Sequence, residues 1–74
     1  MNKDRRERLA DAAAKIDTAV DEVANVIFDE QDALLGVPAN LQNSERYYDA
    51  ENAVDAMQET VDELNDIAER LREL

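Results

Sequence analysis

The fold of this chain is decided by the segment Leu34-Leu35-Gly36-Val37-Pro38. It holds the only glycine and the only proline among the 74 residues. Glycine commonly ends a helix, and proline prevents the helix from continuing. On both sides of this break, apolar residues recur at steps of three and four, the spacing of one helical face. The sequence therefore predicts two helices joined by a single bend.

Two apolar seams of equal length lie on either side of the bend. The seam of the first half contains Leu9, Ala13, Ile16, Val20, Val23, Ile27, Glu30 and Leu34. The seam of the second half contains Tyr47, Ala50, Val54, Met57, Val61, Leu64, Ala68 and Leu71. Folding the chain at the bend sets Leu34 opposite Tyr47 and pairs the two seams along their length. This predicts an all-α fold, an antiparallel helical hairpin of coiled-coil type.

The expected boundaries follow from the local capping signals. The single domain covers residues 1–74, with a first helix at about 4–35, a bend at 36–43 and a second helix at about 44–73. Asp4 is the predicted N-cap of the first helix, with Glu7 reaching back to it in a capping box. Gly36 is the expected left-handed stop. Asn43 or Ser44 is the predicted cap of the second helix.

The apolar surface of each predicted helix is wider than a two-helix contact requires. On the first helix it spreads from Ala12, Ala19 and Val26 on one flank to Ala24, Phe28 and Leu35 on the other. On the second helix it adds Ala53, Ala56, Thr60, Ile67 and Leu74. A small chain without cysteine or histidine also lacks the disulfide or zinc ion that stabilises many domains of this size. We therefore expect a homodimeric four-helix bundle. Its predicted interface consists of Val26, Phe28, Leu35, Ala53, Thr60 and Ile67.

Charge is distributed unevenly along the chain. Nineteen acidic residues against eight basic ones give a formal net charge of −11. Residues 16–69 contain fifteen acids and one base, Arg46, whereas residues 1–15 and 70–74 are slightly basic. Seven acids of the second helix follow steps of three and four and form one outward row, called the acidic stripe below. The acidic stripe consists of Glu51, Asp55, Glu59, Asp62, Asp66, Glu69 and Glu73.

The acidic stripe has two interpretations. Neighbouring like charges at this spacing destabilise a helix by about 0.2–0.5 kcal/mol per pair, and no lysine or arginine relieves the repulsion. A solvated face that keeps a small protein soluble is one interpretation. The other is an anionic surface for a basic protein partner, with a charge density that approaches that of nucleic acid.

Several classes of function are disfavoured by composition. The chain is too acidic to bind nucleic acid directly through its phosphates. It has no histidine and no cysteine, and its one glycine cannot form a phosphate-binding loop. We therefore predict no catalytic residue, no cofactor and no metal site. Because no secretory signal and no long apolar run are readable, we expect a cytoplasmic protein without membrane contact.

The bend concentrates apolar side chains and all three aromatic residues. One interpretation is a small satellite core, in which Val37 and Leu41 fold back over Phe28 and Leu35. The alternative is a partner-binding surface at the hairpin tip. The predicted tip residues are Phe28, Leu41, Arg46 and Tyr48.

Glu30 interrupts the seam of the first helix one turn before the bend. One interpretation is a carboxylate that pairs with Arg46 at the start of the second helix. The other is a device that disfavours slipped helix pairings. For Arg46 itself, Asp32 and Asp49 are further candidate partners.

The residues around the bend also form a distinctive motif. It reads Asp29-Glu30-Gln31-Asp32-Ala33-Leu34 and then Pro38-Ala39-Asn40-Leu41-Gln42-Asn43-Ser44-Glu45-Arg46-Tyr47. It resembles the bend of a group of small acidic helical proteins encoded by bacteriophages, prophages and related mobile elements. Their bends often read Pro-Glu-Asn-Leu-Gln-x-Ser-Glu-Arg; here Ala39 replaces the glutamate, and Tyr48 follows Tyr47. The resemblance implies this genetic setting but no assigned activity.

Two main functions remain open at the level of sequence, while a third, a bundle that binds a small ligand between its helices, is disfavoured by the close-packing, alanine-rich seam. The first is a non-enzymatic phage or prophage accessory protein that binds and modulates a host or defence protein. The acidic stripe or the hairpin tip would form the contact. The second is a structural or assembly component, a helical bundle with no inhibitory role.

Overall fold

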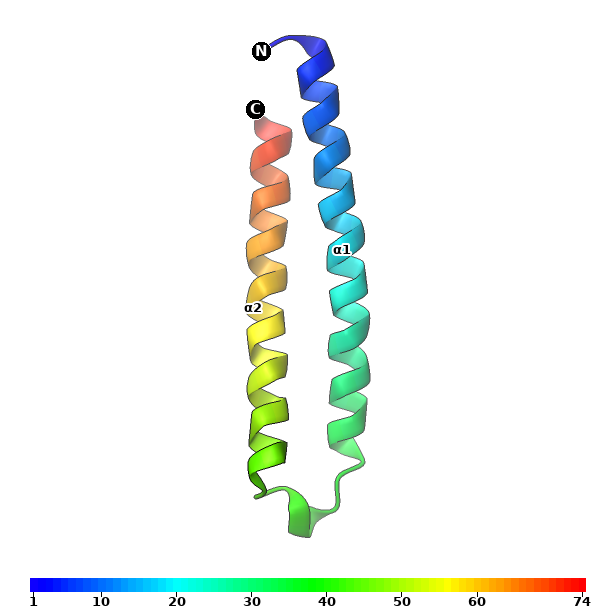
Figure 1. The fold of residues 1–74 in the computed structure, drawn as a ribbon, viewed down its shortest axis with the longest axis vertical. Coiled ribbons are helices and arrows are strands. Elements are labelled where there is room, and N and C mark those ends of the chain that lie inside the picture. Colours follow the sequence, from blue (N-terminus) through cyan, green and yellow to red (C-terminus); the bar gives the residue numbers. More distant parts are fainter.

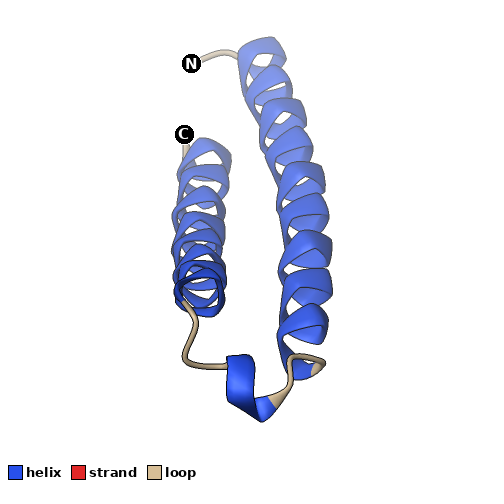
Figure 2. Cartoon of the chain, turned by 60° about the horizontal axis from the view of Figure 1, so that its bottom comes forward, coloured by secondary structure: helices blue, strands red, loops and turns tan.

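The chain forms two long antiparallel helices. The computed structural model describes all 74 residues. Helix α1 spans Lys3–Leu35, the short 3-10 helix η1 spans Ala39–Leu41, and α2 spans Glu45–Glu73. The two long helices lie side by side with both termini at one end and η1 at the other, and a second view agrees (Figures 1 and 2). The predicted all-α hairpin is confirmed.

The hairpin is a thin rod. Its Cα atoms extend over 60 × 14 × 12 Å, with a radius of gyration of 17.2 Å. A compact domain of this length has a radius of gyration of about 11 Å. The rod has two ends of different character: the hairpin tip around η1, and an end that carries both termini, called the open end below.

The first helix begins earlier than the sequence predicted. Asn2 is the N-cap, and its side-chain Oδ1 accepts a hydrogen bond from the backbone N–H of Arg5 at 2.9 Å. The predicted cap, Asp4, lies inside the first turn, and Glu7 contacts Lys3 at 3.9 Å instead of reaching back to it. Asn and Asp cap equally well, so starting at Asn2 satisfies a donor of the first turn just as a cap at Asp4 would, and it adds helical residues.

At the bend, the expected left-handed conformation of Gly36 is wrong, and the expected cap at Ser44 is confirmed. Gly36 is not left-handed: its φ is −83° and its ψ is −5°, and its N–H bonds back to Ala33 in a tightened last turn. Pro38 cannot donate a hydrogen bond, so the chain leaves the helix there without a left-handed residue. Ser44 caps α2, because its Oγ accepts from the N–H of Tyr47 at 3.2 Å.

The core is the predicted seam. Its buried residues are Ala13, Ile27, Val54 and Ala68. The other twelve seam positions are partly buried and none is exposed, Glu30 included. No large side chain is completely enclosed, because each helix has only one neighbour. The period of the apolar pattern thus determined which side of each helix faces the other.

The two sides of the hairpin differ in chemistry. With the seam at heptad positions a and d, an antiparallel pair places the g positions of both helices along one side and the e positions along the other. A groove lined by Val26 and Thr60 marks the g side, and one lined by Ala24 and Gln58 marks the e side. The g side is called the apolar face. It consists of Ala12, Ala19, Val26, Ala33, Ala53, Thr60, Ile67 and Leu74.

The opposite side is called the polar face. It consists of Ala10, Asp17, Ala24, Gln31, Glu51, Gln58, Asn65 and Arg72. The single ion pair between the two helices lies here, between Asp17 and Arg72. Side chains tilt toward the N-terminus of their own helix, so these two reach toward one another in an antiparallel pair. Sequence reasoning missed this pair, because the e positions of the two residues become neighbours only when the two helices pack antiparallel along their seams.

Candidate partner-binding surfaces

The acidic stripe is solvent-exposed along the whole of α2. All seven of its residues are exposed. The hairpin contains only two ion pairs, Lys3–Glu7 and Asp17–Arg72, and neither involves the stripe. The stripe carboxylates occupy heptad positions e, b and f, which turn toward the polar face and the outside of α2. The stripe is therefore a row of like charges without intramolecular neutralisation.

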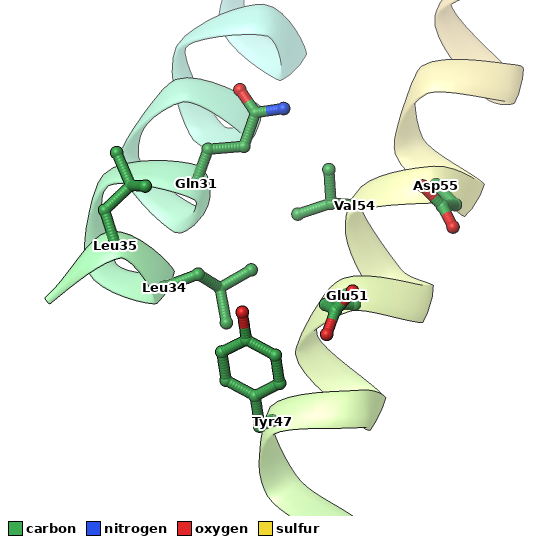
Figure 3. Close-up of a pocket in the computed structure, with 7 residues that line it drawn as sticks. All are labelled: Gln31, Leu34, Leu35, Tyr47, Glu51, Val54 and Asp55. Carbon is green, nitrogen blue, oxygen red and sulfur yellow. The ribbon is translucent and has the colours of Figure 1, made fainter. Parts of the chain in front are cut away.

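The stripe begins beside a groove near the tip. This groove is lined by Gln31, Leu34, Leu35, Tyr47, Glu51, Val54 and Asp55. In Figure 3, Leu34 and Tyr47 point toward one another between the helices, as the seam pairing predicted, whereas Leu35 points away from α2. Glu51 and Asp55 frame the apolar centre of the groove from α2. A cationic side chain with an apolar stem would find complementary surface here.

The predicted tip residues do not form one patch. Leu41 and Arg46 line a common groove on the apolar side of the tip, together with Val37 and Tyr47. Phe28 does not contribute to that groove. The tip is thus a weaker candidate for a single binding surface than the stripe.

Tyr48 also lies outside the groove that Leu41 and Arg46 share. Its Oη donates to Asn43 at 3.3 Å, and its ring meets that of Tyr47 edge-on, with 6.3 Å between ring centroids. These contacts fix Tyr48 against the start of α2 and keep it apart from the rest of the predicted tip surface.

The satellite core expected at the bend is not present. Phe28 and Leu35 are 68% and 85% exposed, so nothing folds back over them. Val37 and Leu41 instead gather beside Leu34 on the other side of the tip. The 3-10 turn of η1 carries Leu41 toward that side, which the sequence pattern did not reveal.

The expected pairing of Arg46 is also wrong. Arg46 makes no ion pair with Glu30, Asp32 or Asp49, and its side chain is exposed. Glu30 and Arg46 do line the same groove, so they are neighbours without direct contact. An exposed ion pair gains little over two solvated side chains, which removes the driving force for the predicted contact.

The predicted dimer interface is divided between two sides. Its residues on the apolar face are Val26, Ala53, Thr60 and Ile67. Leu35 lines a groove with polar-face residues, and Phe28 precedes it by one heptad and shares its register. One flat partner cannot contact both sets at once. Heptad position separates the two sets once the antiparallel packing of the two helices is given.

Two further properties of the surface concern metals and membranes. No group of three carboxylates lies close enough together to hold a metal ion. Neither helix has an apolar stretch of the length needed to cross a bilayer.

Comparisons with protein-family models, with curated proteins and with solved structures find no match to this chain. The functional interpretation of these surfaces therefore rests on their geometry and charge.

Proposed function

We propose that this hairpin is a non-enzymatic accessory protein of phage or prophage origin that binds a basic surface on another protein. The acidic stripe is the binding surface, and the partner is a host or defence protein whose own ligand is polyanionic. The resemblance of the bend supports the genetic setting. The observation that carries the proposal is the stripe itself, seven exposed carboxylates without an ion pair.

Charge repulsion supports binding over solubility as the role of the stripe. A solubilising surface normally mixes both signs, which removes repulsion while keeping the surface hydrated. The seven acids of the stripe follow one another in six successive steps along one helix with no base among them, so their repulsion is not relieved. A cationic partner surface would relieve the repulsion on binding, so the strain present in the free hairpin becomes part of the affinity.

Geometry also supports a partner that normally holds nucleic acid. Duplex DNA carries about one charge per 1.7 Å of axis. Residues 16–69 carry a net charge of −14, fifteen acids against one base, along the body of a rod 60 Å long. The body of the rod therefore presents a long row of negative charge to a surface that normally holds nucleic acid.

A matched pair of charge variants tests the proposal. The stripe variant carries Asp55→Lys, Asp62→Lys and Glu69→Lys. The control carries Asp11→Lys, Asp21→Lys and Asp32→Lys, which are exposed positions on α1 with the same change in net charge. Each tagged protein is used to recover partners from host cells at about 0.1 M and about 1 M salt, where the Debye length falls from about 10 Å to about 3 Å.

We expect specific partners to be retained by the wild type and the control, lost by the stripe variant and released at high salt. DNA added at low salt should compete for the same partners. Equal retention by both variants, or retention that salt does not change, would contradict the proposal.

A structural or assembly role is the second candidate. It is favoured by the apolar face, which is exposed in the single hairpin. It predicts self-association and no salt-sensitive capture of other proteins. The charge variants therefore separate the two candidates.

A further inference from the structure

The hairpin exposes more surface than a compact folded monomer of the same mass. Its accessible surface is 5766 Å², whereas a compact monomer of 8.4 kDa exposes about 4,600 Å². The excess is roughly 1,150 Å² per chain. Stable dimers bury on the order of 800 Å² on each partner. One interface with a second copy would thus bring the exposed surface close to that of a compact protein.

The apolar face is the surface that such an interface would use. It has four positions on each helix, and its large side chains Val26, Ile67 and Leu74 are 54%, 43% and 59% exposed. The polar face, by contrast, carries an ion pair and the first carboxylate of the stripe. Docking through the apolar face leaves both acidic stripes in solvent, where their repulsion is weakest.

We propose that two hairpins dock through their apolar faces with the tip of each beside the open end of the other. This completes a four-helix bundle in which α1 packs on α1 of the second copy and α2 on its α2. The two-fold axis crosses the rod at Ala19. This inference does not depend on the proposed function, since the stripe stays outside the interface.

A single position of the two-fold axis along the rod relates apolar-face residues on both helices. Val26 and Met57 line the same groove, so they lie within about one helical turn of each other along the rod. If they are taken as level, Ala19, seven residues toward the open end, is level with Leu64, which lies about midway between Thr60 and Ile67. An axis at this level therefore relates Val26 to Ala12 of the second copy.

The same axis relates Ile67 to Thr60 and Leu74 to Ala53 of the second copy. In each case a larger residue meets a smaller one, the condition for interdigitated packing. Ala19 meets its own copy on the axis, where two small side chains let the α1 helices approach closely.

Charge favours this arrangement over docking with both tips at one end. Heptad position c borders the apolar face, as shown by Glu22, which lines the groove with Val26 and Thr60. In the proposed dimer, Lys15 meets Glu22 of the second copy, and one heptad further on Arg8 meets Asp29.

Docking with both tips at one end would produce like-charge contacts at the same border. Lys15 would then face Arg70 of the second copy, and Glu22 would face Glu63. The proposed arrangement contains one like-charge contact, Glu63 with itself. Opposite charges across an interface fix its register, and like charges disfavour the wrong one.

Single-cysteine variants test the arrangement directly, because the natural chain has no cysteine. We expect Ala19→Cys to form a disulfide dimer on mild oxidation, since the two Cα atoms on the axis lie within disulfide reach. Asn25→Cys, on the outer surface of α1, is the control and should stay monomeric under denaturing electrophoresis. Cross-linking of Asn25→Cys as readily as Ala19→Cys would overturn the proposal.

A mixture of Ala19→Cys and Thr60→Cys chains tests for the arrangement in which both tips lie at one end. The proposed dimer gives Ala19→Cys homodimers. Preferential cross-linking between the two different chains would mean that both tips lie at one end, and the proposal would be wrong.

Oligomeric state supplies an independent test. Light scattering should give twice the chain mass of 8.4 kDa for the wild type. Val26→Glu with Ile67→Glu should raise the dimer dissociation constant more than about tenfold, because it buries unpaired charge. The control Phe28→Glu with Leu35→Glu makes the same change at two exposed apolar residues outside the apolar face and should leave the dimer intact. A monomeric wild type, or a dimer lost only in the control, would refute the interface.

Discussion

Gly36 shows how a helix ends without a left-handed residue. Its N–H and that of Val37 bond back three residues to Ala33 and Leu34, so the last turn of α1 tightens before the chain leaves it. The φ of −83° is accessible to any amino acid. Pro38, which lacks an N–H, stops the helix, and the freedom of glycine is not used.

This conformation predicts that Gly36→Ala stabilises the hairpin. A Cβ at position 36 would meet only the carbonyl oxygen of Ala33, at an ordinary contact distance of 3.5 Å. Alanine also reduces the entropy of the unfolded chain, so we expect a gain of about 0.4–1 kcal/mol in the free energy of unfolding. Chemical denaturation followed by circular dichroism measures it. A loss of stability would show that the glycine needs a left-handed conformation.

At the scale of the helices, burial follows the seam so closely that neighbouring residues have opposite environments. Ile27 is 9% exposed, and Phe28, the next residue, is 68% exposed. A shift of one residue in the register of α1 would exchange these environments. The alternation of three and four therefore gives the pairing its specificity, while the small number of enclosed side chains limits its strength.

The difference in burial between Ile27 and Leu35 predicts that truncating each to alanine lowers the free energy of unfolding by different amounts. Ile27→Ala removes buried methyl groups between the helices and should lower the free energy of unfolding by about 2 kcal/mol or more. Leu35→Ala removes a side chain that is 85% exposed and should change it by less than about 0.5 kcal/mol. Thermal melts at one fixed protein concentration compare the two variants. Equal losses would mean that Leu35 is covered in solution.

At the scale of the whole molecule, charge is polarised along and around the rod. The body is acidic, the open end is slightly basic, and the stripe lies outside the apolar face. Such a distribution leaves one side of the hairpin suited to self-association and another to a cationic partner. The two proposed surfaces can therefore be occupied together.

Repulsion along the stripe predicts that salt stabilises the hairpin. Between about 0.01 M and 0.15 M salt the Debye length falls from about 30 Å to about 8 Å, which weakens repulsion between stripe carboxylates. We expect Tm to rise by about 3–5 °C over this range, because 1 kcal/mol shifts Tm of a domain this size by about 4–8 °C.

The variant with Asp62→Asn and Asp66→Asn supplies the control for this salt effect. It removes two neighbouring charges from the middle of the stripe and should show a smaller rise in Tm. A wild-type Tm that is flat or falls with added salt would mean that the stripe is already neutralised.

The fold class, the helix pairing, the residues of the seam and the row of acids could all be predicted from the sequence. These depend on periodicity, and helical geometry converts a period directly into a face. Helix ends were less predictable: Asn2 and Asp4 are equivalent caps, and only the structure distinguishes them. Local alternatives of similar free energy cannot be ranked by a one-dimensional pattern.

How the flanks of the two helices combine follows from the way the helices pack in three dimensions. The pattern of each helix has an apolar flank on both sides of its seam, and the crossing geometry decides which flanks share a side. The structure joins Val26 with Thr60 in one groove and leaves Phe28 and Leu35 outside it. It likewise brings Asp17 to Arg72, 55 residues apart in the chain. Such pairings depend on the relative rotation of two helices, which the period of either helix alone does not contain.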